Sequence, residues 1–193
     1  MKVLVISVHP DDETLGCGGT VLKHRNQNDD IYWLILTEAN ESLGYSKEFI
    51  VQRTNQIKDI SQEYQFSKTY SLGFPTTKLH TIDFSVIIDK IFSVIQEIKP
   101  EVIYTVNRSD IHTDHQVAAK AIMSCTKSFR NPFIKRILMY ECISETEIAF
   151  PLPENMFVAH VYSDISSFLE RKIEIMKKYG SELQAPPLTK KLR

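Results

Sequence analysis

The stretch Val3-Leu4-Val5-Ile6-Ser7-Val8-His9-Pro10-Asp11-Asp12-Glu13 decides the fold of this chain. Its first six residues are nearly all apolar and mostly β-branched, which is typical of a strand buried on both faces of a parallel sheet. The strand runs directly into a histidine, a proline and three acidic residues. We therefore expect an α/β sheet with a polar site where this strand ends.

Four further segments have the same strand-like pattern, at 32–37, 69–74, 102–106 and 137–140. Helical patterns alternate with these strands. The first follows the glycines at 16, 18 and 19 and reaches about Arg25, and another begins at Thr113 with a capping-box pattern to Gln116. The others lie at 47–64, 84–98 and 165–179. This alternation predicts a Rossmann-like, doubly wound, mostly parallel sheet with helices on both faces. We expect one domain over residues 1–193, with a frayed end at 185–193.

The composition excludes several classes of protein. The chain has 23 Lys and Arg residues against 24 Asp and Glu residues and a formal charge of −1, which gives no electrostatic case for binding nucleic acid or an anionic membrane. Cys17, Cys125 and Cys142 show no C-x-x-C spacing, which argues against a disulfide scaffold or a thiolate zinc site. No targeting segment or membrane-spanning stretch is visible, so we expect a cytoplasmic protein.

A second polar cluster, His112-Thr113-Asp114-His115, follows the expected strand at 102–106. In a doubly wound sheet of order 3-2-1-4-5, the first and fourth strands are neighbours across the switch point, and ligands bind at their carboxyl ends. The topology therefore brings the two clusters together and predicts a metal site at the carboxyl ends of strands 1 and 4.

The two clusters hold enough groups for metal-assisted hydrolysis. Two imidazoles and a carboxylate would hold a divalent ion and leave positions open for water and substrate. One further carboxylate and one further histidine remain, and amide hydrolysis needs a base and a donor for the developing oxyanion. A plain structural interpretation also exists, in which His9 to Asp12 form a turn ahead of a helix and His112 and Asp114 cap another.

The chain resembles the PIG-L/LmbE family of zinc-dependent N-deacetylases. The likeness is carried by Ser7-Val8-His9-Pro10-Asp11-Asp12-Glu13, the Gly-rich turn Gly16-Cys17-Gly18-Gly19, and Asp110-Ile111-His112-Thr113-Asp114-His115. The resemblance implies hydrolysis of an N-acetyl group from a small amino sugar or sugar conjugate, with release of acetate and a free amine.

The resemblance also implies residue roles. His9, Asp12 and His115 would ligate zinc, and Asp11 would be the general base. His112 would polarise the amide carbonyl, and Asp114 would orient a histidine. Glu13 would support the loop, and Arg53 is a candidate substrate contact.

The chain departs from the family pattern around the expected substrate site. The departures are at Glu38-Ala39-Asn40-Glu41, at Gln56 in Arg53-Thr54-Asn55-Gln56, at Thr76-Thr77 and at Ala159-His160. We also expect the family's C-terminal segment to be missing or truncated. These departures weaken the assignment of a particular sugar more than the assignment of the reaction.

Three hypotheses therefore stay open. The first is the sugar N-deacetylase, the second is a metal-dependent hydrolase of another amide or an ester, and the third is a catalytically silent sugar- or metal-binding homologue. Two histidines and a carboxylate suit ferrous iron as well as zinc. The sequence indicates neither the oligomeric state nor the pathway.

Overall fold

A five-stranded parallel sheet forms the centre of the molecule, with strand order β3-β2-β1-β4-β5 as predicted. The computed structural model describes residues 1–143, 145–150 and 152–180. The strands are β1 (Lys2–Ser7), β2 (Asp30–Glu38), β3 (Lys68–Pro75), β4 (Val102–Val106) and β5 (Arg136–Tyr140). The sheet is parallel at every pairing, so all five carboxyl ends lie at one edge.

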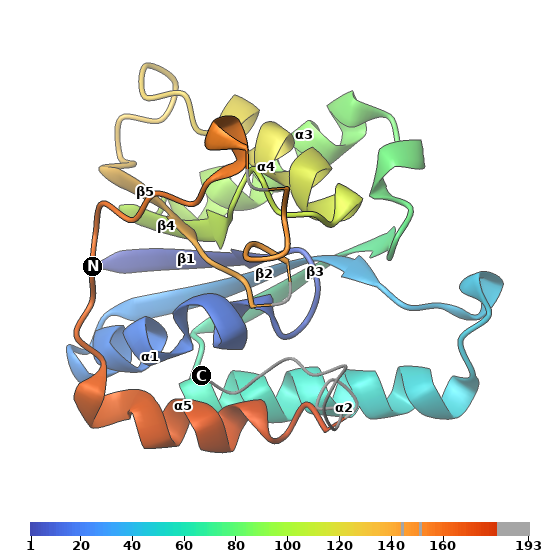
Figure 1. Ribbon diagram of the computed structural model, residues 1–193, viewed down its shortest axis with the longest axis horizontal. Helices are drawn as coiled ribbons and strands as arrows, with labels where there is room; N and C mark the ends of the chain where they lie inside the picture. Colours follow the sequence, from blue (N-terminus) through green and yellow to red (C-terminus); the bar gives the residue numbers. More distant parts are fainter. Residues whose placement is uncertain (144, 151, 181–193) are drawn as a thin grey trace.

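Helices cover both faces of this sheet (Figure 1). They are α1 (Asp12–Asn26), α2 (Lys47–Tyr64), α3 (Phe84–Ile98), α4 (Thr113–Cys125) and α5 (Leu169–Met176). In Figure 1, α3 and α4 lie on one face, and α1, α2 and α5 lie on the other. The fold is therefore the doubly wound α/β arrangement expected from the sequence.

Strand β1 lies at the centre of the core. Val3, Leu4, Val5 and Ile6 are all fully buried, because β2 and β4 pair with β1 on its two sides and helices cover both faces. Its carboxyl end therefore opens between β2 and β4, at the switch point of the sheet.

Helix α1 differs from its prediction, because it begins at Asp12 and contains the glycines that we expected to form a turn before it. The missing side chains allow close packing instead. A Cβ atom on Gly16 would lie 2.1 Å from Cδ2 of Tyr140, and one on Gly19 would lie 2.6 Å from Cδ1 of Ile165. The glycines let α1 approach β5 and the segment before α5.

The last helix is shorter than the predicted 165–179. A 3-10 turn, Ser166–Phe168, precedes α5, which runs from Leu169 to Met176. Oδ1 of Asp164 accepts hydrogen bonds from the backbone N–H and the hydroxyl of Ser166, as an N-cap residue does. The helical segment therefore begins close to the predicted residue, with a first turn that is 3-10.

The frayed end expected at 185–193 lies outside the described residues. Among the residues that are described, no helix combines the length and the apolar character needed to cross a membrane.

Candidate active site

The loops after β1 and β4 bring His9, Asp12 and His115 together. Nδ1 of His9 lies 3.2 Å from Nε2 of His115, and that nitrogen lies 3.5 Å from Oδ2 of Asp12. One potential ligand atom from each residue lies within 4.8 Å of the others. Asp12 and His115 are buried, whereas His9 is partly exposed toward a cavity.

Asp114 fixes the orientation of the His9 ring. Nε2 of His9 lies 3.3 Å from Oδ2 of Asp114, and this carboxylate also accepts hydrogen bonds from the backbone N–H groups of Thr77 and Leu79. Burial alone would raise the pKa of Asp114, but these hydrogen bonds outweigh it and lower the pKa. The ionised Asp114 accepts the proton on Nε2 and leaves Nδ1 of His9 facing the centre of the cluster.

Asp110 does the same for His115, and sequence analysis assigned it no role. Nδ1 of His115 lies 2.9 Å from Oδ2 of Asp110, which is fully buried. Burial lowers the pKa of His115, but the charges of Asp12 and Asp110 outweigh it and raise the pKa to about 9. A signal was present in the sequence, since Asp110 opens the motif that ends at His115.

Asp12 is held by the backbone of its own loop. Its Oδ2 accepts hydrogen bonds from the backbone N–H groups of Val8 and His9, both at 2.9 Å. The loop therefore folds around this carboxylate and directs it toward His115.

The donor set fits a divalent cation. Two ring nitrogens face each other, and each ring donates its other N–H to a buried carboxylate, an arrangement that recurs behind metal-bound histidines. Two nitrogens at zinc–nitrogen distances of about 2.0–2.1 Å on one tetrahedral ion would be separated by roughly 3.4 Å, which is close to the observed 3.2 Å. The group His9, His112 and Asp114 satisfies the same distance criterion, but there both oxygens of Asp114 and Nδ1 of His112 already accept backbone N–H groups, whereas both backbone N–H groups that bond to Asp12 use its Oδ2.

Asp11 has a strained backbone at the edge of this cluster. Its φ angle is 139°, a region that non-glycine residues rarely adopt, and its side chain is nearly buried. Strain of this kind costs roughly 1–3 kcal/mol and is concentrated at functional sites. Asp11 is the N-cap residue of α1, yet its side chain makes no capping hydrogen bond. The loop does form the turn ahead of a helix that the plain interpretation expected, but the Asp11 side chain does not cap that helix.

Glu13 stabilises the same loop through hydrogen bonds to both of its carboxylate oxygens. Its Oε2 accepts hydrogen bonds from the Ser7 hydroxyl and the Asp11 N–H, and its Oε1 accepts hydrogen bonds from the hydroxyls of Thr14 and Tyr179. Burial raises the pKa of Glu13 to about 7. These contacts match the supporting role expected for Glu13.

His112 caps α4 and faces the cavity. Its Nδ1 accepts a hydrogen bond from the Asp114 N–H at 3.1 Å, so the neutral ring carries its proton on Nε2. Burial and the neighbouring His9 and His115 lower the pKa of His112 to about 4. The predicted capping box is therefore wrong in detail: helix α4 begins at Thr113, but His112 provides the cap and the Gln116 amide donates to the Asp110 carbonyl instead.

A cavity of about 900 Å³ opens over the cluster. Its walls include His9, Asp11 and His112. Tyr45, from the connection between β2 and α2, and Arg53, from α2, also line it. Arg53 donates from Nη1 to the Pro10 carbonyl at 3.3 Å, and its guanidinium lies 5.5 Å from the ring centroid of Phe49. The structure thus places the predicted substrate contact in the wall of the same cavity.

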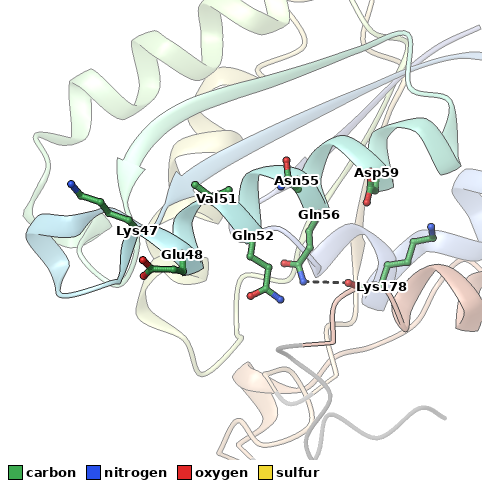
Figure 2. Close-up of a pocket in the computed structure, with 8 residues that line it drawn as sticks. All are labelled: Lys47, Glu48, Val51, Gln52, Asn55, Gln56, Asp59 and Lys178. Atoms are coloured by element: carbon green, nitrogen blue, oxygen red, sulfur yellow. Dashed lines mark hydrogen bonds between the residues drawn. The ribbon is translucent and has the colours of Figure 1, made fainter.

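A second hollow lies on the outward face of α2, where the Gln56 amide donates to the Lys178 carbonyl (Figure 2). Its volume is about 660 Å³, and its lining includes Lys47, Glu48 and Asp59 but no histidine. It shares no residue with the candidate metal-binding group, whereas the first cavity is lined by His9 and Asp12 of that group.

The chain is similar to known deacetylases in sequence and in fold. A probable N-acetyl-alpha-D-glucosaminyl L-malate deacetylase 2 from Bacillus cereus is 24% identical over 191 residues, which cover 95% of this chain and 84% of that protein. The solved structure of N,N'-diacetylchitobiose deacetylase from Pyrococcus horikoshii matches with a TM-score of 0.73 at 18% identity, covering 95% of this chain and 71% of that one.

The same fold also occurs with a different reaction. GalB, the 4-carboxy-2-hydroxymuconate hydratase from Pseudomonas putida, matches with a TM-score of 0.66 at 14% identity, covering 94% of this chain and 79% of that one. The family model described as PIG-L, GlcNAc-PI de-N-acetylase, matches residues 4–126, which include both polar clusters and more than half of the sequence. This chain therefore belongs to the PIG-L family.

Proposed function

We propose that this protein is a metal-dependent N-deacetylase that hydrolyses the N-acetyl group of an amino sugar or sugar conjugate and releases acetate and a free amine. One observation carries the proposal. Two histidines and an aspartate converge beside a cavity, and a buried carboxylate orients each histidine. Asp11 and His112 line that cavity as well.

His9, Asp12 and His115 would hold the ion. A divalent cation there would supply Lewis acidity, which polarises the amide carbonyl and makes a water molecule acidic enough to attack it. Asp11 would take the proton from the attacking water and pass it to the leaving nitrogen. The neutral His112 ring would donate its Nε2–H to the oxyanion that develops on the carbonyl oxygen.

The ion that we propose is zinc, on the basis of the family. Ferrous iron is the alternative, because the same donor set suits it. Metal analysis of the purified protein distinguishes the two. Cys17, Cys125 and Cys142 are buried and form no disulfide with one another, which supports a reducing compartment such as the cytoplasm.

An amino sugar is the proposed substrate class because of what the relatives act on. The Bacillus cereus relative is named for a glucosaminyl malate, and the Pyrococcus horikoshii enzyme is named for diacetylchitobiose. The fold alone does not select this reaction, since a hydratase shares it. The proposal therefore depends on Asp11 and His112 more than on the shape of the molecule.

The sharpest test replaces the proposed base. Asp11→Asn should lower acetate release from N-acetylated sugars by about 10²- to 10⁴-fold, which is the usual contribution of a positioned base, while the metal content per chain stays that of the wild type. Asp59→Asn, at an exposed position on α2, should keep full activity. Full activity in Asp11→Asn would show that the base is assigned wrongly. Hydrolysis of simple amides or esters without any sugar preference would favour the second hypothesis.

A further inference from the structure

A turn after β5 contacts the candidate metal centre from a third side. Cys142 and Thr146 stand at its two ends, where the Cys142 carbonyl accepts hydrogen bonds from the N–H groups of Glu145 and Thr146. Both side chains are buried, Cys142 with 1% and Thr146 with 6% of its surface exposed. The Glu145 carbonyl in turn accepts a hydrogen bond from the N–H of Ile111, inside the second motif. The turn is therefore fixed to the β4–α4 loop.

The Thr146 hydroxyl bonds directly to the carboxylate that orients His115. It donates to Oδ1 of Asp110 at 2.7 Å and accepts from the Cys142 N–H at 2.8 Å. A hydroxyl has a single proton, and the Cys142 N–H can only donate, so the proton must go to Asp110. Asp110 is thereby held at both oxygens, by Thr146 on one and by His115 on the other.

The Cys142 thiol contacts a different proposed ligand. Its Sγ lies 3.4 Å from Oδ1 of Asp12 and donates to it. The other oxygen of Asp12 accepts the N–H groups of Val8 and His9. The thiol therefore adds a contact from the β5 side to a carboxylate that also bonds to its own loop and lies 3.5 Å from Nε2 of His115.

We propose that Thr146 and Cys142 are positioning residues of the metal centre: Thr146 acts on His115 through Asp110, and Cys142 acts on Asp12. Three strand ends, those of β1, β4 and β5, then set the geometry of the site, although the sequence motifs come from only the first two. This inference rests on the proposed function, because it assumes that His9, Asp12 and His115 bind an ion.

The effect on metal affinity should follow the strength of each donor. Partners that orient metal ligands typically change metal affinity by about 10- to 100-fold when they are removed. A hydroxyl bonded to a charged carboxylate is a strong interaction, whereas a thiol is a weak donor. We therefore expect loss of the Thr146 hydroxyl to weaken metal binding more than loss of the Cys142 thiol.

The experiment measures the Kd for Zn²⁺ by competition with a chromophoric chelator, together with the thermal midpoint of the metal-free protein. Thr146→Val should raise the Kd by about 10- to 100-fold, and Thr146→Ser, which restores the hydroxyl, should return it to the wild-type value. The matched control is Thr126→Val, at a buried threonine whose hydroxyl donates to the Met123 carbonyl at the end of α4. This control should leave the Kd unchanged even if it lowers the midpoint.

Cys142 gives an independent test that alters fewer contacts. Cys142→Ala should raise the Kd by a smaller factor than Thr146→Val, and Cys142→Ser should keep the wild-type value. Cys125→Ala is the control, because Cys125 is also buried but donates to the Ile88 carbonyl.

The outcomes separate this inference from the proposed function. A wild-type Kd in both Thr146→Val and Cys142→Ala, or an equal change in Thr126→Val, would overturn the positioning role while leaving the deacetylase proposal intact. A wild-type protein that binds Zn²⁺ and responds to Thr146→Val, but deacetylates no acetylated sugar, would overturn only the proposed reaction. A wild-type protein that binds neither Zn²⁺ nor Fe²⁺ would overturn both.

Discussion

Each proposed imidazole ligand has a buried carboxylate behind it, but the two rings use opposite nitrogens. His9 turns Nε2 to Asp114, whereas His115 turns Nδ1 to Asp110. The remaining nitrogens face each other as a result. The hydrogen bond at one nitrogen already sets the orientation of each ring, so an ion can bind without rotating the rings, although His115, with a pKa of about 9, must first release a proton.

A partly buried lysine, Lys172, gives a test of burial that does not involve the metal. Lys172 on α5 donates from Nζ to the Leu15 carbonyl at 2.9 Å, and burial lowers its pKa below the usual 10.5. Above the lowered pKa the folded protein has lost this proton while the unfolded chain still binds it. The stability contributed by Lys172 must therefore rise with pH until the unfolded lysine also titrates.

We accordingly expect the wild type to gain unfolding free energy relative to Lys172→Met as the pH rises from 8 to 10. Chemical denaturation at several pH values measures this difference, in which the other titrating groups cancel. Lys177→Met, at an exposed position just after α5, should show no such pH dependence. A difference that stays constant or falls with pH would mean that the Lys172 ammonium is well solvated.

At the scale of elements, the sequence predicted best where hydrophobic periodicity alone determines the structure. Helices α2 and α3 begin and end at the predicted residues, and β4 matches as well. Prediction was poorer where local hydrogen bonds or tertiary contacts decide how a helix begins. The first turn after Asp164 is 3-10, so α5 itself begins only at Leu169, and the glycines of α1 serve close packing inside the helix rather than a turn before it.

The packing of α1 can be tested through Gly19 and Ile165. Alanine is favoured over glycine inside a helix by about 1 kcal/mol, but a Cβ on Gly19 would lie only 2.6–2.9 Å from atoms of Ile165. Gly19→Ala should therefore lower the free energy of unfolding by about 1–3 kcal/mol, the usual cost of overpacking.

Ile165→Ala removes most of the side chain that the new Cβ would contact, and it completes a double-mutant cycle with Gly19→Ala. Gly19→Ala in an Ile165→Ala background should be neutral or stabilising, with a coupling energy of about 0.5–3 kcal/mol between the two sites. Urea denaturation of the four proteins gives this value. Simple additivity would indicate that α1 does not depend on glycine for its approach to the segment before α5.

At the scale of the whole molecule, topology explains which part of the site could be predicted. The order of the sheet places the ends of β1 and β4 side by side, and the sequence motifs lie at those two ends. Cys142 and Thr146 could not be found in this way. Their contacts with Asp12 and Asp110 span 130 and 36 residues, and only the folded chain brings these pairs together.

The stability of the whole molecule should depend on the ion. A ligand that binds only the folded state stabilises it by about 2.7 kcal/mol at a free concentration of 100 times its Kd. For a chain of this size each kcal/mol raises Tm by roughly 2–4 °C, so saturating Zn²⁺ should raise the Tm of the chelator-treated protein by about 5–10 °C.

His115→Ala should abolish this shift because it removes a ligand from the centre. His80→Ala should preserve it, because His80 is exposed and belongs to neither candidate ligand group. Differential scanning fluorimetry with and without Zn²⁺ measures all three proteins. A full shift in His115→Ala would place the ion elsewhere, because a site that lacks one of its three ligands cannot provide the same free energy of binding.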